Sequence, residues 1–151
     1  MESVYKDLLF TDLNLSTNME VIDFLGSELQ KKGKVKEDFC QRVKEREIGF
    51  PTGLPTMPYG VAIPHTEQNS VNETCLCFAR LKNEVVFKSI LGDGSDVMVR
   101  FVFLLASVDS DGHMSFMKNI MTAFQSEEIQ YKLLSAKDSD ELYEILKFIN
   151  D

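Results

Sequence analysis

The sequence predicts an α/β fold, a three-layer α/β/α sandwich with a mixed central sheet, from two observations. Helical patterns of apolar residues occur towards both ends of the chain, whereas residues 61–106 contain short runs rich in β-branched and aromatic residues. The run 96–106 is apolar at consecutive positions in its middle, as expected for a central strand that is covered on both faces. We therefore expect helices to flank the strands at both ends of the chain.

The length of 151 residues suits a single domain, residues 1–151, and 44% hydrophobic residues suffice for a substantial core. The formal net charge of -8 argues against a nucleic-acid partner and against an anionic membrane surface, because both select basic faces. The longest apolar run, 101–106, is too short to insert into a membrane. An odd number of cysteines and an N-terminus without a leader pattern favour a cytoplasmic location.

Two helices are predicted before residue 50. Thr17 and Glu20 have capping-box spacing, and Gly33 is a stop signal after a run with helical periodicity, which comprises Val21, Ile22, Leu25 and Leu29. A second helix is expected over 36–46, with an apolar side formed by Phe39, Cys40 and Val43.

The C-terminal third also has helical patterns. The first of these patterns places four apolar residues on one helix face: Phe116, Ile120, Met121 and Phe124. Asp138 and Glu141 have the spacing of a second capping box, and the apolar positions that follow are Leu142, Ile145, Leu146 and Ile149.

The segment 50–60 is predicted to be a loop, because it holds three of the four prolines and two glycines. Short strands are expected after it, at residues 61–63, 74–81, 85–87 and 96–106. Cys75 and Cys77 would lie on the same side of their strand, but no second Cys or His pair completes a tetrahedral metal site. We interpret them as buried structural residues and expect no metal and no cofactor.

His65 is one of only two histidines, and it follows Pro64 at the end of the run Val61 to Ile63. Proline fixes its own backbone angle and biases the residue before it towards an extended conformation. A buried strand followed by proline therefore forms a rigid base for the next side chain, which suits a group that must meet a partner in one geometry. The alternative is a loop histidine without a function.

His113 is the other histidine, and it lies at the apparent N-terminus of a helix just after the strand 96–106. Ligands of open α/β sheets bind outside strand ends, and helix N-termini favour anions. Considered alone, His113 fits a capping or surface role slightly better than a functional one.

Residues 46–66, REIGFPTGLPTMPYGVAIPHT, resemble the active-site segment of the mannitol/fructose-type enzyme IIA family of the bacterial phosphoenolpyruvate-dependent sugar phosphotransferase system. The shared pattern is Arg-Glu, a loop containing Pro-Thr, and a strand that ends in Pro-His. The apolar strand, a His-Met where the family often has His-Leu, and the closing helices follow in the family's order. The Phe-Pro-Thr-Gly loop is most similar to the galactitol-specific subgroup.

The resemblance implies a phosphotransferase that works through a phosphohistidine intermediate. His65 would accept a phosphoryl group from the histidine-containing phosphocarrier protein and pass it to a cysteine of a cognate enzyme IIB, with the membrane component IIC contacted only indirectly. His113 would stabilise the phosphoryl group, and the Arg46 guanidinium would hold its oxygens. The alternative for Arg46 is a solvated charge at a helix end.

Two threonines are further candidates for phosphate binding. The Thr52 hydroxyl lies in the Pro-Thr-Gly turn, where it could equally stabilise the turn itself. Thr66 follows the histidine where the family commonly has a small residue, so its hydroxyl is either an additional donor or a tolerated change. Pro58 and Tyr59 also depart from the family pattern, and the sugar is not readable from the sequence. Related domains act as regulators through their phosphorylation state, as the nitrogen-related enzyme IIA does, and this role is the alternative function.

Overall fold

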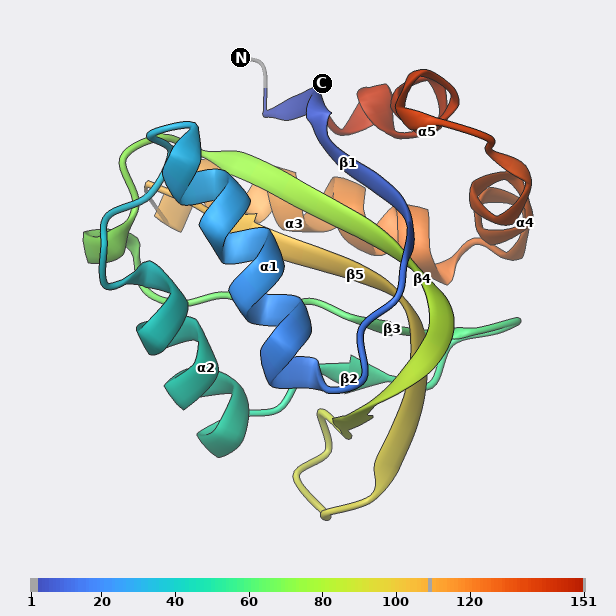
Figure 1. The fold of residues 1–151 in the computed structure, drawn as a ribbon, viewed down its shortest axis with the longest axis horizontal. Coiled ribbons are helices and arrows are strands. Elements are labelled where there is room, and N and C mark those ends of the chain that lie inside the picture. Colours follow the sequence, from blue (N-terminus) through green and yellow to red (C-terminus); the bar gives the residue numbers. More distant parts are fainter. Residues whose placement is uncertain (1–2, 109, 151) are drawn as a thin grey trace.

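The computed structural model describes residues 3–108 and 110–150, with residues 110–115 described by their backbone alone. A five-stranded sheet with the order β1-β4-β5-β3-β2 forms the middle layer (Figure 1). Its strands are β1 (Val4–Leu13), β2 (Gly53–Leu54), β3 (Gly60–Ala62), β4 (Cys75–Lys88) and β5 (Asp96–Ala106). The pairs β1/β4 and β3/β5 are parallel, whereas β4/β5 and β2/β3 are antiparallel. The predicted mixed sheet is confirmed.

Helices cover both faces of this sheet. One face carries α1 (Asn18–Lys31) and α2 (Phe39–Gly49), and the other carries α3 (Ser110–Gln125), α4 (Glu127–Ser135) and α5 (Ser139–Leu146) (Figure 1). Two short 3₁₀ helices complete the described chain, η1 (Gln68–Ser70) and η2 (Lys147–Asn150). The ends of the chain lie side by side, because the Asn150 side chain accepts a hydrogen bond of 2.7 Å from the Ser3 amide. The layers are those of the predicted three-layer sandwich.

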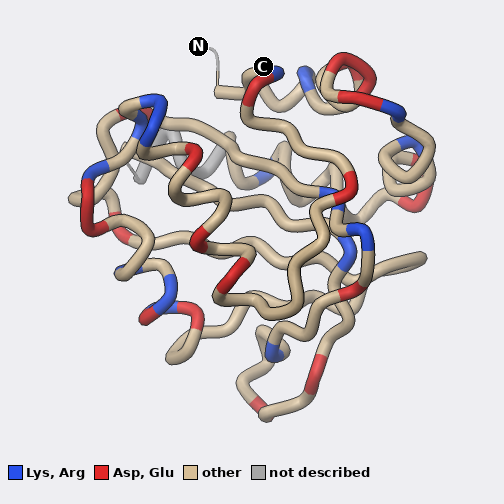
Figure 2. The backbone as a smooth tube through the Cα atoms, in the orientation of Figure 1, with Lys and Arg blue, Asp and Glu red and all other residues tan. Residues whose placement is uncertain are grey.

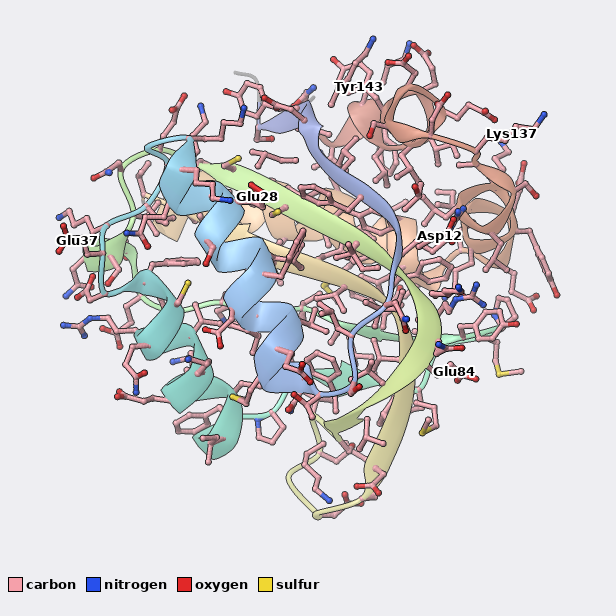
Figure 3. All side chains as sticks on the ribbon, in the orientation of Figure 1. Asp12, Glu28, Glu37, Glu84, Lys137 and Tyr143 are labelled. Carbon is pink, nitrogen blue, oxygen red and sulfur yellow. The ribbon has the colours of Figure 1, made fainter. Side chains whose placement is uncertain are left out.

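The two faces of β4 bury different side chains. Leu76 and Phe78 belong to the core under α3 to α5, where the Phe78 and Phe103 ring centroids lie 4.9 Å apart. Cys75 and Cys77 belong to the core under α1 and α2. This alternation confirms that both thiols share one side of the strand. Figure 3 shows side chains filling the space between the sheet and both helical layers.

Helix ends follow the predicted signals closely. Thr17 caps α1 through its hydroxyl, which accepts from the Glu20 amide at 3.2 Å, while the Glu20 carboxylate accepts from the Thr17 amide at 3.1 Å. Gly33 has a left-handed φ of 71° two residues beyond the helix. Asp138 caps α5 by accepting from the Glu141 amide at 2.9 Å. Helix α2 differs from the predicted 36–46, because it spans Phe39–Gly49, and Asp38 before it makes no side-chain cap hydrogen bond.

Three expectations about the strands were wrong. Strand β2 (Gly53–Leu54) lies within the segment 50–60 that was predicted to be a loop, and it pairs with β3. The described chain begins with strand β1 rather than with a helix, and β1 is an edge strand whose polar positions interrupt the apolar pattern. Residues 85–87 are not a separate strand, because β4 continues through exposed Lys82 to Glu84 as far as Lys88. The pairing register with β5 shifts between Arg80 and Val85, so the polar residues mark an irregularity in one strand rather than its end.

Lys and Arg residues are interspersed with Asp and Glu along the described backbone (Figure 2). Several form exposed ion pairs, such as Lys32 with Asp7 at 2.6 Å and Lys44 with Asp23 at 2.8 Å. Within the described residues, no helix combines the length and apolar character that crossing a membrane requires.

Candidate functional site

The parallel neighbours β3 and β5 end at the same edge of the sheet. The chain leaves β3 through buried Ile63 and Pro64, and the Pro64 carbonyl accepts a hydrogen bond of 3.0 Å from the Leu105 amide. His65 therefore follows a segment that is fixed to the central strand. The backbone of α3 begins just beyond the end of β5, so the same edge also carries the first turn of that helix.

The imidazole ring of half-buried His65 is oriented by its own backbone. Nδ1 lies 2.8 Å from the carbonyl oxygen of Ile63. A carbonyl oxygen can only accept, so in the neutral ring this contact assigns the proton to Nδ1 and the lone pair to Nε2. The nitrogen that can act as a nucleophile is therefore Nε2.

Behind His65, Thr52 forms a hydrogen-bonded junction between the loop and the end of β3. Its hydroxyl accepts from the Ile63 amide at 3.2 Å and donates to Oε1 of Glu47 at 2.8 Å. Its backbone amide donates to Oε2 of Glu47 at 2.8 Å. A hydroxyl has one hydrogen, and here Glu47 receives it. The sequence left phosphate binding and stabilisation of the turn open for Thr52, and these hydrogen bonds are of the second kind.

Sequence reasoning missed Glu47 as a site residue. Its side chain is only 4% exposed, and burial raises the pKa of its carboxyl group to about 7, although the hydrogen bonds from the Thr52 amide and hydroxyl act in the opposite direction. A signal was present in the sequence. Glu47 continues the four-residue spacing of Phe39 and Val43, the buried residues of α2, so the helical pattern places a carboxylate at a core position.

A pocket of about 320 Å³ lies beside this segment, and it brings together two of the predicted site residues, Arg46 and Thr66. The Arg46 guanidinium carbon lies 5.3 Å from the centroid of the Phe50 ring, which also lines the pocket. The Arg46 Nε is buried and has no hydrogen-bond partner among the described residues. A buried donor of this kind is costly to leave unpaired, so the arrangement suits an anionic ligand.

The remaining lining residues carry both signs of charge. Glu45 and Glu67 are exposed carboxylates, and Arg42 forms an ion pair with Asp38 at 2.6 Å. The pair lowers the pKa of Asp38 through the hydrogen bond from Arg42. Arg46 is therefore the lining cation for which the described residues provide no ion pair.

His113 belongs by its backbone to the first turn of α3, as the sequence predicts. Its side chain lies outside the described residues, so its predicted role beside His65 stays a prediction.

Cys75 and Cys77 are both buried, and neither forms a disulfide bond. Burial raises the pKa of Cys75 to about 12 and raises that of Cys77 well above its usual value. Within the described residues, no group of three or more His, Cys, Asp or Glu side chains is arranged to hold a metal ion.

Comparison with known proteins relates this site to a family. The chain is 28% identical over 148 residues to the fructose-specific EIIABC component of the phosphotransferase system of Bacillus subtilis (strain 168), covering 91% of this chain but only 22% of that protein. It is 26% identical over 132 residues to the galactitol-specific EIIA component of Escherichia coli (strain K12), covering 87% of each chain.

Solved structures share the fold. The complex of mannitol enzyme IIA with phosphorylated mannitol enzyme IIB from Escherichia coli matches with a TM-score of 0.78 and 24% identity, covering 94% of this chain and 95% of that chain. The crystal structure of mannitol IIA from Escherichia coli matches with a TM-score of 0.75 and 23% identity, covering 96% and 99%.

The profile of one family, described as phosphoenolpyruvate-dependent sugar phosphotransferase system, EIIA 2, matches residues 2–148. The chain therefore belongs to the EIIA 2 family of this system, whose members are phosphotransferases that act through a phosphohistidine intermediate.

Proposed function

We propose that His65 is the phosphorylated residue of this phosphocarrier. The observation that carries the proposal is the contact of His65 Nδ1 with the Ile63 carbonyl at 2.8 Å, because it leaves the lone pair on Nε2 in the neutral ring. Pro64, held to β5 through its carbonyl, fixes the backbone from which the ring projects. In-line transfer needs one fixed nucleophile geometry, which this segment supplies.

In the proposed reaction, Nε2 attacks the phosphorus of a phosphohistidine on the histidine-containing phosphocarrier protein. A nitrogen–phosphorus bond forms at His65 while the corresponding bond of the donor breaks, and the donor imidazole leaves with the electron pair. In the next step a cysteine thiolate of a cognate enzyme IIB attacks the same phosphorus. A sulfur–phosphorus bond then forms, and His65 recovers its lone pair.

The pocket lined by Arg46 and by Thr66, the residue after His65, supports charge stabilisation during these steps. The Arg46 guanidinium would donate to the phosphoryl oxygens, and half-buried Thr66 lines the same pocket. We place His113 as a further donor, because the first turn of α3 begins at the sheet edge where β3 ends. The proposed transfer requires no metal.

Among sugars and polyols, we propose galactitol as the substrate that the complete system takes up. The galactitol-specific relative supports this choice because it is a separate EIIA component of which the match covers 87%, whereas the fructose-specific relative is a much longer EIIABC protein. EIIA passes a phosphoryl group and does not contact the sugar itself, so specificity lies in the choice of enzyme IIB.

The test is direct labelling. The chain is incubated with phosphoenolpyruvate, enzyme I and the phosphocarrier protein, and an acid-labile phosphate on His65 is expected by mass spectrometry. Equal labelling of wild type and His65→Ala would exclude His65 as the acceptor. The phosphorylated chain is then offered to galactitol-, fructose- and mannitol-specific enzyme IIB, and faster transfer to either of the last two would contradict the galactitol assignment.

A further inference from the structure

Glu47 is a buried acid that the proposed chemistry does not use directly. It lies in the last turn of α2, and both carboxylate oxygens accept hydrogen bonds from one residue, Thr52. Burying a carboxyl group costs free energy unless its hydrogen bonds are satisfied, and a helix C-terminus disfavours negative charge. An acid at this position therefore indicates a specific use for its two acceptor oxygens.

That use is to hold Thr52 in one orientation. With its backbone amide and its hydroxyl hydrogen both directed at Glu47, the Thr52 hydroxyl presents a lone pair towards the Ile63 amide, 3.2 Å away. A hydroxyl that was not oriented in this way could rotate its hydrogen towards the same amide and lose the contact. Glu47 thus determines whether Thr52 can accept from Ile63.

Ile63 in turn supplies the carbonyl that orients His65. Its amide is held by Thr52, its carbonyl accepts from His65 Nδ1 at 2.8 Å, and the next carbonyl, that of Pro64, is held by Leu105. Pro64 has no amide hydrogen of its own, so the Thr52 and Leu105 contacts fix the backbone on the two sides of the Ile63 carbonyl. The chain of contacts runs from Glu47 through Thr52 and Ile63 to the imidazole ring.

We infer that Glu47 is a positioning residue for His65: through Thr52 and the Ile63 backbone it keeps the imidazole in the Nδ1–H tautomer, with the lone pair on Nε2. The expected effect of Glu47 on the rate of phosphoryl transfer rests on the proposed phosphorylation of His65. The state of the ring does not depend on that proposal and can be observed without any phosphoryl donor.

The test compares Thr52→Val with Thr52→Ser. Valine keeps the amide bond to Glu47 and the shape of threonine but removes the hydroxyl, whereas serine keeps the hydroxyl. Two-bond ¹H–¹⁵N NMR spectra report the tautomer of His65. We expect a pure Nδ1–H pattern in wild type and Thr52→Ser and a mixture in Thr52→Val, with phosphoryl acceptance slowed by about 10- to 100-fold only in Thr52→Val.

Glu47→Gln provides the second variant. It keeps one acceptor oxygen, so we expect a smaller effect in the same direction on both the tautomer and the rate. In the double variant Glu47→Gln with Thr52→Val, the rate should be no lower than in Thr52→Val alone, because both changes interrupt one pathway. Glu84→Gln is the matched control for charge, since exposed Glu84 lies on β4, across the molecule from α2 in Figure 3.

The possible results distinguish the positioning role of Glu47 from the proposed phosphorylation of His65. A wild-type His65 tautomer in folded Glu47→Gln overturns the positioning role of Glu47, whatever the transfer rate and whatever Thr52→Val shows. Absence of labelling in wild type overturns the proposed function, and the NMR comparison still decides the role of Glu47. If Thr52→Val does not fold, the His65 signals of Glu47→Gln decide alone, and their identity with wild type overturns the inference.

Discussion

The Thr52 hydroxyl donates a hydrogen bond of 2.8 Å to Oε1 of Glu47, and both side chains are only 4% exposed. This contact joins the last turn of α2 to the loop that leads to β2. Because the same hydroxyl accepts from the Ile63 amide, the contact also connects α2 to the end of β3. The helix that contributes Arg46 to the pocket and the strand that presents His65 are therefore joined through one buried polar cluster.

Glu47 should make the stability of the protein depend on pH. Burial raises the pKa of its carboxyl group from 4.5 to about 7 in the folded chain, so between these values the folded state binds the proton more tightly than the unfolded state. Its contribution is most favourable below about pH 4.5 and is lost as the pH rises through 7. Relative to Glu47→Gln, wild type should lose about 3 kcal/mol of unfolding free energy over this range.

Urea unfolding of both chains between pH 4.5 and 8 measures this effect, and the difference between them cancels contributions from other groups. Glu84→Gln serves as a control in which an exposed carboxylate is removed, and its difference from wild type should stay nearly constant. A constant difference for Glu47→Gln as well would show that Glu47 titrates normally in the folded chain.

Gly60 permits the close approach of β3 to β5. A Cβ atom at this position would lie 2.8 Å from Cγ1 of Val97 and still closer to the carbonyl oxygen of Met98, a backbone atom that is held in the sheet. Gly60→Ala should therefore destabilise the fold by about 1–3 kcal/mol. Thermal unfolding measures the loss, and the His65 NMR signals should shift because His65 follows β3 in the chain, three residues after Ala62.

Gly49→Ala is the matched control for this substitution. Apart from its chain neighbours and the backbone of its own helix, no atom lies within 4 Å of a Cβ built at Gly49, and the residue ends helix α2. Alanine has the higher helix propensity, so this variant should be as stable as wild type or up to about 1 kcal/mol more stable. Equal destabilisation by the two substitutions would contradict the role of close packing at Gly60.

Local patterns predicted the parts of the fold that are locally determined. The bounds of β5 agree with the predicted 96–106, because its apolar run is continuous, and the start of α1 follows from the capping box at Thr17. Strand β1 was missed because an edge strand buries few positions, here Val4, Leu8 and Leu9, whose spacing does not alternate as expected for a strand.

The residues of the candidate site also differ in whether a local sequence pattern can predict them. His65 and Arg46 are candidates from the sequence because their positions in a continuous segment carry the family resemblance, and their roles stay predictions. The partners of Thr52 could not, because its hydroxyl meets the Ile63 amide eleven residues further along the chain, a contact that depends on how β3 joins the sheet. Carboxylates are usually exposed, so a buried Glu47 is the less probable interpretation of any single glutamate.

Arg80 should be a large contributor to stability. Its buried guanidinium donates through Nη1 to the carbonyls that end α4, with distances of 2.8 Å to Leu133 and 2.6 Å to Ala136. Arg80→Met would leave these carbonyls without that donor, so we expect a loss of about 2–4 kcal/mol in urea unfolding.

The ion pair of Arg80 with Asp12 should matter much less. It has a distance of 3.1 Å, but the Asp12 side chain is 59% exposed at the position labelled in Figure 3. Asp12→Asn should cost no more than about 1 kcal/mol, because solvent screens exposed pairs and asparagine tolerates the left-handed φ of 55° found here. A loss as large as that of Arg80→Met would mean that the pair, rather than the helix-end carbonyls, explains the burial of Arg80.

Arg46 should govern the rate of phosphoryl acceptance more than it governs stability. Its guanidinium lies at 5.3 Å from the Phe50 ring and lines the pocket next to Thr66, where it can meet phosphoryl oxygens with two parallel donors. Arg46→Gln should slow acceptance by about 100-fold or more, and Arg46→Lys should fall between this variant and wild type because an ammonium keeps the charge but loses the planar fork.

Lys44→Gln is the matched control, since it removes one positive charge from the same helix, where Lys44 pairs with Asp23. Quenched-flow transfer from the phosphorylated carrier protein measures all four rates, and equal rates for Arg46→Gln and Lys44→Gln would reduce Arg46 to a solvated charge at a helix end.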